Sequence, residues 1–403
     1  MTTQREVWIT GIGLLSSLGE GADAHWQALS DPSFPPPVLD TETCAPCPVH
    51  PLAAIDYDRQ IPKKGDQRQM EPWQRIGTYT AGLALADAAV AGAAELLART
   101  HMVVAAGGGE RDVAVDLALV HDLATATDPA PALNARLLAD LRPTLFLAQL
   151  SNLLAGSISI VHGVRGSSRT LMGEEAAGAD AARIAHARIA AGQADLALFG
   201  GALNAVRQDL AMLYGGSGTA LRGPWQPVWQ RAGVDAGFAM GSQGGFVVLE
   251  EAAHARARGA RGLARLTAIG SDISRPGSFA PAAAIWEGMR AHRADGTLGV
   301  ISGATGARDV TDDERGFLAS LAEDGPIAVR ATGTRLGHGV EASFPLNLAL
   351  AALALSRGGF YPPFEPAEHA AETPVRQILV TGFAARRGQA LALLEPLDQT
   401  GAP

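Results

Sequence analysis

Short apolar runs that stop at glycine recur along the first half of the chain. Residues 7–10 read Val-Trp-Ile-Thr and run into Gly11, and residues 102–105 run into three consecutive glycines. Apolar runs at 195–199 and 245–250 have the same uninterrupted form. Runs without polar alternation are typical of strands that are buried on both faces. We therefore predict a sheet covered by helices on each side.

Between the first two runs the apolar positions change their spacing. Ile76, Tyr79, Leu83 and Ala86 recur at intervals of three and four residues, which predicts a helix with one apolar face that packs on the sheet. Its end is expected near residues 91–92, where alanine is followed by glycine. Strands that alternate with such helices indicate the α/β class.

The order of elements appears a second time after a basic, alanine-rich segment at 254–261. The β-favouring runs of this second series lie at 263–270, 297–303, 377–381 and 390–394. We predict two similar halves, an N-terminal one over residues 1–255 and a C-terminal one over residues 256–403. The repeat is one of element order rather than of sequence identity.

Two stretches fall outside this repeat. Residues 30–64 are rich in proline and lack periodicity, and residues 125–143 form a further insertion. Irregular, proline-rich segments are common on protein surfaces, so both are predicted to be surface elaborations.

Charge and composition exclude several classes of function. The chain has 41 acidic and 32 basic residues, a formal charge of −9, which disfavours nucleic acid as a partner. No run approaches the roughly 18 apolar residues of a membrane span, and the first residues carry no signal-peptide pattern. We expect a cytoplasmic protein with no membrane span.

Cys44 and Cys47 are the only cysteines, so a disulfide framework is excluded. With His50 they have metal-site spacing, but a structural zinc site needs about four ligands. The three glycines at 107–109 lack both the lysine of a phosphate loop and the spacing of a dinucleotide fingerprint. No metal and no cofactor is predicted.

Four segments together resemble the β-ketoacyl-acyl-carrier-protein synthases, the condensing enzymes of fatty-acid and polyketide synthesis. They lie at residues 7–19, 192–202, 227–241 and 247–260. This resemblance spans nearly the whole chain. It implies a duplicated thiolase-like fold, a five-layered α-β-α-β-α sandwich, with acyl carrier protein as a partner and a dimer as the assembly.

The family's nucleophile is a cysteine where a strand turns into a helix, where the helix N-terminus lowers the thiol pKa. The matching segment here is residues 166–178, and Glu175 stands at the position of that cysteine. Neither cysteine of this chain lies near it.

The two histidines that the family uses for decarboxylation are also replaced. Gly303 stands at the place of the first and Thr334 at the place of the second. Glu314 matches the family's glutamate, and Arg330 lies near the place of its lysine. His338 follows Thr334 by about one helical turn and is a candidate for the second histidine's role, although a lone histidine is more often structural.

The family's glycine-rich gate near the C-terminus is altered as well. Phe383 is retained, whereas Ala385 replaces a phenylalanine and Arg386 and Arg387 replace glycines. Arginine side chains fill space that glycine leaves open. We predict that Glu175 forms an ion pair with Arg386 or Arg387 and plugs the substrate pocket. The alternative is that its carboxylate imitates the malonyl carboxylate.

These changes leave no confident catalytic residue, and whether the chain is an acyltransferase stays open. The leading hypothesis is a non-catalytic subunit similar to the chain-length factors, which pairs with an active β-ketoacyl-ACP synthase and shapes its acyl pocket. Residues 61–75 resemble the second synthase-like protein of very-long-chain acyl synthesis for lipid A. One alternative is a synthase or malonyl-ACP decarboxylase with an atypical site. Another is a homodimer that binds acyl carrier protein.

Overall fold

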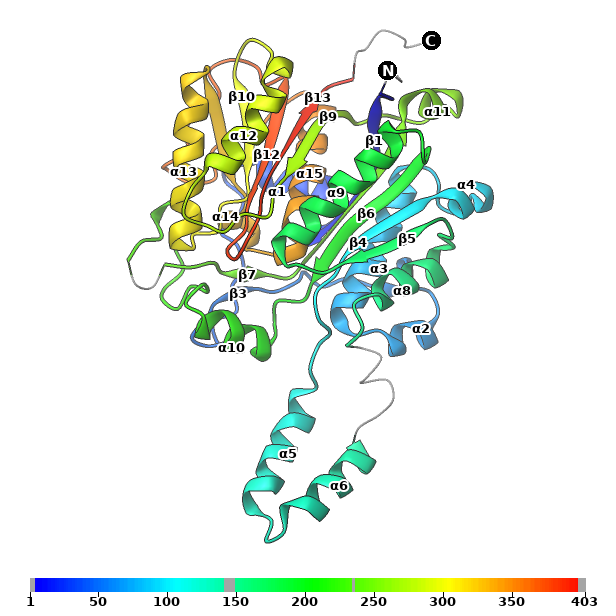
Figure 1. Cartoon of the computed structure of the whole chain (residues 1–403), viewed down its shortest axis with the longest axis vertical. Coiled ribbons are helices and arrows are strands. Elements are labelled where there is room, and N and C mark those ends of the chain that lie inside the picture. Colours follow the sequence, from blue (N-terminus) through cyan, green and yellow to red (C-terminus); the bar gives the residue numbers. More distant parts are fainter. Residues whose placement is uncertain (1–3, 141–148, 234–235, 398–403) are drawn as a thin grey trace.

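A single mixed sheet forms the centre of the computed structural model, which describes residues 4–140, 149–233 and 236–397 (Figure 1). Its strand order is β11-β10-β12-β13-β9-β1-β8-β6-β4-β5, with β2 beside β1. The strands are β1 (Val7–Ser16), β2 (Gly19–Glu20), β4 (His101–Ala105), β5 (Ser168–Leu171), β6 (Leu196–Leu203), β8 (Gln243–Glu251), β9 (Ala264–Ser271), β10 (Leu298–Ser302), β11 (Ile327–Ala331), β12 (Gln377–Phe383) and β13 (Gln389–Glu395).

The topology shows the duplication directly. When the strands are numbered within each half, with β2 left out, both halves have the order 3-2-4-5-1 from the outer edge. In both, the first two pairs of neighbours are parallel and the next two are antiparallel. The first strands of the two halves, β1 and β9, pair antiparallel at the seam. The boundary predicted between residues 255 and 256 lies within α11 (Ala252–Ala257) and stays a prediction.

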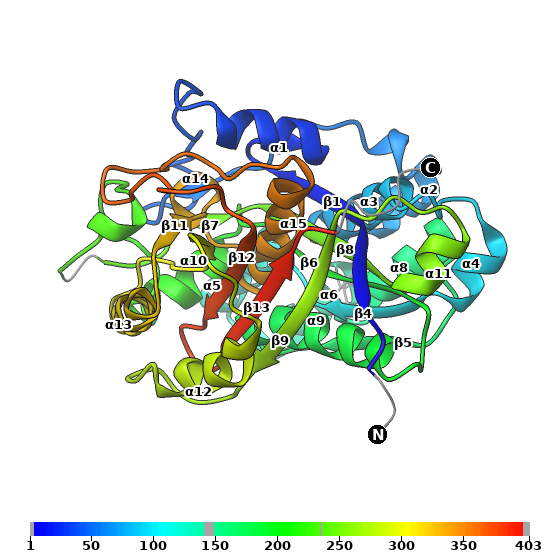
Figure 2. The same cartoon turned by 90° about the horizontal axis from the view of Figure 1, so that it is seen from above.

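Helices cover the sheet in layers (Figure 2). The helices α9 (Glu175–Ala190) and α15 (Ser343–Ser356) pack together between the two halves of the strongly twisted sheet. The outer face of the N-terminal half carries α3 (Pro72–Asp87) and α8 (Leu153–His162), and that of the C-terminal half carries α12 (Ala280–Met289) and α13 (Arg308–Glu323). The predicted five-layered α/β architecture is confirmed.

The helix predicted from Ile76 onwards is α3, but two details of the prediction are wrong. α3 ends at Asp87 rather than near residues 91–92, and Ala86 is exposed. The buried side runs almost around the helix because α3 lies between the sheet and α8. Glycine in β1 allows this close approach, since a Cβ at Gly13 would lie 2.1 Å from the carbonyl oxygen of Thr80.

Residues 30–64 are only partly the surface elaboration that was predicted. Cys44, Cys47 and Ile61 are buried, and β3 (Val49–His50) pairs with β7 (Met240–Gly241). Shorter helices are α1 (Gly21–Ser30), α2 (Lys64–Gln69), α4 (Ala94–Arg99), α10 (Gln208–Gly216) and α14 (Gly333–Leu336). Over the described ranges, no helix has the length and apolar character needed to cross a bilayer.

The insertion predicted at 125–143 begins earlier and is helical. α5 (Val113–Thr125) and α6 (Pro129–Asp140) form a hairpin that projects from the body of the molecule (Figure 1). Residues 141–143 lie outside the described residues. The hairpin leaves the sheet after β4, on the same side as α10.

Candidate functional site

The turn from β5 into α9 positions two consecutive acidic side chains. Glu174 precedes the helix with φ 56° and ψ −134°, a left-handed conformation that non-glycine residues rarely adopt and that functional sites often contain. Glu175 is the first residue of the helix. The turn separates the two carboxylates: Glu174 lines one pocket and Glu175 lines another.

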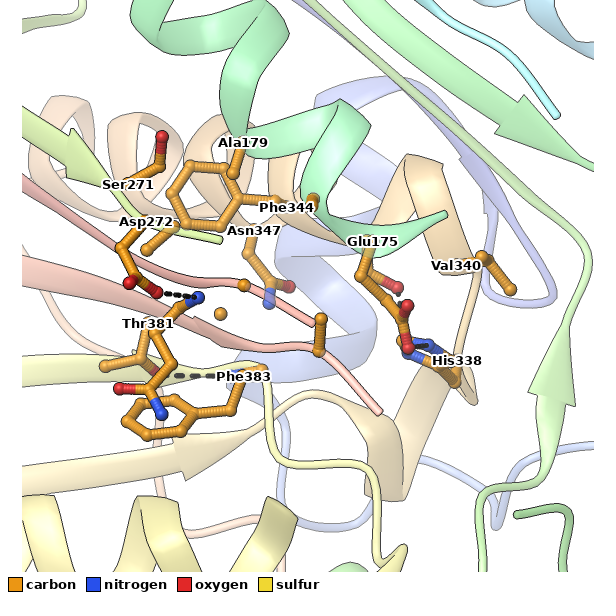
Figure 3. A pocket seen from close by; sticks show the side chains of 18 residues that line it. Glu175, Ala179, Ser271, Asp272, His338, Val340, Phe344, Asn347, Thr381 and Phe383 are labelled. Carbon is orange, nitrogen blue, oxygen red and sulfur yellow. Dashed lines mark hydrogen bonds and ion pairs between the residues drawn. The ribbon is translucent and has the colours of Figure 1, made fainter. Parts of the chain in front are cut away.

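Glu175 is held by two donors. Its Oε1 is 3.2 Å from Nε2 of His338 and 3.2 Å from the backbone N–H of Ala385 (Figure 3). Burial by itself would raise the pKa of Glu175, but the hydrogen bond and the charge of His338 outweigh burial and lower it. Position 175 therefore holds an ionised carboxylate at neutral pH.

A further hydrogen bond joins His338 to the start of α15. Nδ1 of His338 is 3.2 Å from Oγ of Ser343, the first residue of α15. That oxygen already accepts from the N–H of Gly339 at 2.8 Å and from Nε2 of Gln243 at 3.2 Å. The Ser343 hydroxyl therefore contacts the ring nitrogen of His338 that does not face Glu175. The resulting chain links the first residues of the two central helices.

The prediction that Glu175 forms an ion pair with an arginine of the gate is wrong, because that arginine pairs with the neighbouring glutamate. Arg386 pairs with Glu174, at 3.3 Å between Nη1 and Oε1. The backbone turn at Glu174 aims that side chain, and not the next one, toward the arginine. The pKa of Glu174 is raised by burial, and the charges of Arg386 and Arg387 offset only part of this shift. The gate loop is therefore tied to α9 by two successive residues, Ala385 and Arg386.

The two positions predicted for the family's histidines, Gly303 and Thr334, differ in their surroundings. Gly303 lines the pocket beside Glu175, but a Cβ there would lie 2.6 Å from the carbonyl oxygen of Thr381. Thr334 is buried outside this lining: its hydroxyl donates to Glu365 at 2.9 Å and accepts from the N–H of Val228 at 2.9 Å. Neither position brings a proton donor or acceptor of its side chain to Glu175.

The pocket at Glu175 lies between the starts of α9 and α15 and the turn from β12 to β13. Its volume of about 30 Å³ holds one or two water molecules and far less than an acyl chain. Phe383 forms part of the wall. The pocket is also lined by Phe344, Asn347, Asp272 and Thr381, which the sequence analysis did not single out.

A second pocket of about 320 Å³ lies on the Glu174 side of α9. Its lining includes Gly107, Arg207 and Glu341. The Glu341 carboxylate accepts from the N–H of Gly107 at 2.8 Å, and burial raises its pKa to about 7. Arg207 pairs with Asp209 at 2.5 Å. Ionisable groups thus reach into the larger of the two pockets at α9.

Glu314 and Arg330 are both buried in the C-terminal half. Glu314 accepts from the hydroxyls of Ser302 and Thr381 behind the pocket, and burial raises its pKa to about 7. Arg330 is directed away from the pocket, and its guanidinium donates to the carbonyl oxygens of Tyr361 and His369.

The two cysteines are free thiols, buried together in the hydrophobic cluster that contains Tyr214 and Phe238. Burial raises the pKa of both, so neither presents a thiolate. The ionisable groups that line the pocket at Glu175 are the carboxylates of Glu175 and Asp272 and the imidazole of His338, with no thiol among them.

Comparison with known proteins identifies the relatives of this chain. Residues 4–255 match the family model Beta-ketoacyl synthase, N-terminal domain. The chain is 28 % identical over 386 residues to the 3-oxoacyl-[acyl-carrier-protein] synthase 2 of Rhizobium meliloti (strain 1021), covering 89 % of this chain and 88 % of the relative. The corresponding synthase of Vibrio harveyi is 25 % identical over 378 residues, with 88 % and 86 % covered.

Solved structures show the same fold. The ishigamide ketosynthase/chain length factor superposes with a TM-score of 0.79 at 21 % identity, over 98 % of this chain and 100 % of that chain. A β-ketoacyl synthase from Burkholderia phymatum gives a TM-score of 0.78 at 19 % identity, with the same coverage. With the match over residues 4–255, these findings show that the chain belongs to the β-ketoacyl synthase family.

Proposed function

We propose that this chain is a non-catalytic, chain-length-factor-like subunit that pairs with an active β-ketoacyl-ACP synthase and shapes its acyl pocket. The observation that carries the proposal is that Glu175, which stands at the position predicted for the nucleophile, is held by His338 and by the N–H of Ala385. Acyl carrier protein then delivers its cargo to the synthase of the pair.

This chain alone lacks the groups that condensation requires. A thioester is exchanged onto a thiolate, and the carboxylate of Glu175 cannot form that thioester. The positions of both family histidines carry residues without a titratable group, Gly303 and Thr334. The cavity of about 30 Å³ beside Glu175 excludes an acyl chain.

The open edge of the sheet supports a paired assembly. β5 is an outermost strand, and in the part of the chain that the structure describes no strand pairs with its outer edge. Ser168 and Arg169 of β5 are exposed. Unprotected edges readily pair with another chain, and the fold of this chain also occurs in a ketosynthase/chain length factor.

The test is co-expression with a cysteine-bearing synthase from the same organism, followed by isolation of the complex and mass spectrometry of the acyl products. We expect a stable complex whose products differ in length from those of the synthase alone. A synthase that makes the same lengths at the same rate without this chain contradicts the proposal.

The contact between Glu175 and His338 favours one second candidate, a malonyl-ACP decarboxylase. This reading requires turnover of malonyl-ACP by the isolated chain, with loss of that turnover in Glu175→Ala. Such a result would overturn the non-catalytic subunit. A homodimer that binds acyl carrier protein without chemistry differs from the chain-length-factor-like subunit in its failure to co-purify with a synthase, and from the decarboxylase in the absence of malonyl-ACP turnover.

A further inference from the structure

A third pocket, of about 300 Å³, lies at the strand ends opposite Glu175. Leu196 at one end of β6 lines it, whereas Leu203 at the other end of β6 lines the larger pocket at α9. Because a strand rises about 3.3 Å per residue, these two leucines lie roughly 20 Å apart. α4 and α11 contribute to its wall and lie away from the α5–α6 hairpin (Figure 1). This α4–α11 pocket is therefore separate from the candidate site.

The charges at the α4–α11 pocket leave two guanidinium groups uncompensated. Asp195 lines the pocket, and Arg5 offsets its charge at 3.1 Å. Arg99 lines the pocket as an exposed side chain, and Arg188 donates to His101 in the wall. In the described part of the chain, neither Arg99 nor Arg188 has a carboxylate partner. Uncompensated positive charge at a pocket attracts an anion.

Two histidines of the wall have Nδ1 engaged and Nε2 unpaired. Nδ1 of His101 is 3.1 Å from Nη1 of Arg188; a guanidinium only donates, so a neutral His101 carries its hydrogen on Nε2. Burial and the charge of Arg188 lower the pKa of His101, which keeps the ring neutral at pH 7. Nδ1 of His254 is 2.6 Å from Glu250, whose carboxylate also pairs with Arg258. Both Nε2 atoms are open to solvent, and no described residue bonds to them.

We propose that the α4–α11 pocket binds a small phosphorylated molecule, whose phosphate is held by the Arg99 guanidinium and by Nε2 of His101 and of His254. Arginine suits phosphate because its planar fork donates to two oxygens at once. Nε2 of a neutral His254 only accepts, and a phosphate monoester, with its second pKa near 6, can keep a proton to donate there. A carboxylate or a sulfate has no such proton at neutral pH. The site does not depend on the pairing with a synthase.

The rest of the wall suits the organic part of such a molecule. Leu96, Ala98, Ala194 and Leu196 line the pocket with apolar side chains, and Gln193 adds an amide. Small-molecule sites are mostly apolar with a few polar groups, and their volumes begin at about 300 Å³. The pocket is therefore larger than a bare phosphate ion requires.

The test measures binding to the full-length chain by isothermal titration calorimetry. The probes are inorganic phosphate, glycerol 3-phosphate and adenosine 5′-monophosphate, with glycerol and adenosine as the matched compounds without phosphate. We expect at least one organic phosphate to bind with a dissociation constant below about 1 mM, more tightly than inorganic phosphate does. Failure of both organic phosphates to bind at about 10 mM, or equally tight binding of inorganic phosphate or of the compound without phosphate, overturns the proposal.

A pair of arginine variants separates a site from diffuse attraction. Arg99→Gln should weaken binding of the organic phosphate about tenfold, because it removes a charge-assisted contact. Arg165→Gln is the control, since it removes the same charge from an exposed arginine outside the lining and should bind as the wild type does. Both side chains are exposed, so the melting temperature should not change. Equal affinities of the two variants would contradict the proposal.

A second pair of variants tests the free nitrogen of His101. The amide of asparagine takes about the place of Nδ1, whereas the amide of glutamine reaches that of Nε2. His101→Asn therefore keeps an acceptor for Arg188 and removes the donor to phosphate, and His101→Gln keeps that donor. We expect binding to weaken about fivefold in His101→Asn and less than about twofold in His101→Gln. Equal or reversed effects would show that Nε2 does not meet the ligand, and would overturn the site as proposed.

Discussion

The two halves of the sheet share one strand order but end in different edges. In the C-terminal half, the outer strand β11 is covered by the segment at 361–369: Glu368 accepts the N–H of Ala331, and Arg330 reaches two carbonyl oxygens of that segment. In the N-terminal half, the outer strand β5 has exposed side chains.

A second difference lies between the second and third strands of each half. In the C-terminal half α13 fills this connection and packs on the sheet. In the N-terminal half α8 packs on the sheet, and the chain adds the projecting hairpin of α5 and α6. The duplication thus supplied one half that is closed within the chain and one half whose edge and insertion face outward.

The largest expected difference in stability lies between two substitutions, one of an arginine on each edge strand. Arg330 of β11 is 1 % exposed and lies near Glu368, so Arg330→Met leaves a buried carboxyl without its cation. We expect a loss of about 3–5 kcal/mol in unfolding free energy, measured by urea denaturation. The matched change on β5, Arg169→Met, should stay within about 0.5 kcal/mol. Equal losses would contradict the difference between the edges.

The second effect concerns the buried Glu314 of the closed half. Its pKa is about 7 in the folded chain against an ordinary 4.5. Below pH 4.5 both states hold the proton; as the pH rises to 7 the unfolded chain releases it first, so stability falls by about 3 kcal/mol. Glu314→Gln should remove this part of the decline in stability between pH 5 and 8, as measured by thermal melting at each pH. The exposed Glu323→Gln should leave the profile unchanged.

A third prediction tests the link between the halves at α9 and α15. His338→Leu leaves Glu175 without its imidazole partner, and we expect a loss of about 2 kcal/mol at pH 7. Because the pKa of Glu175 is lowered, the loss should fade as the pH falls below the ordinary value of 4.5. Adding Glu175→Gln should restore part of the stability. Purely additive effects in this double-mutant cycle would show that the contact contributes nothing.

The smallest effect is expected at the gate. Arg386 is 53 % exposed and pairs with Glu174, so solvent screens the interaction. Arg386→Ala should change the unfolding free energy by less than about 1 kcal/mol. A loss comparable to that of His338→Leu would mean that the gate loop depends on the ion pair rather than on the backbone contact with Glu175.

Local patterns predicted the strands well because glycine-terminated apolar runs are a property of consecutive residues. The end of α3 and the exposure of Ala86 were missed, since they depend on where α8 packs. The partner of Arg386 was assigned to the wrong carboxylate, because one backbone torsion at Glu174 decides it and no residue type announces that torsion. Ser343 was missed because its role arises only when α15 and the loop at 338 come together.

The position of Glu175 at the first turn of a 16-residue helix, close to the start of α15, has a consequence for how such a chain arises. The partial positive charge at the N-terminus of a helix favours any anion there, whether sulfur or oxygen carries it. A cysteine thiolate and a glutamate are therefore electrostatically interchangeable at this point of the fold. Under the proposed function, replacing the thiolate by a carboxylate at this position removes the nucleophile and keeps the favourable electrostatics.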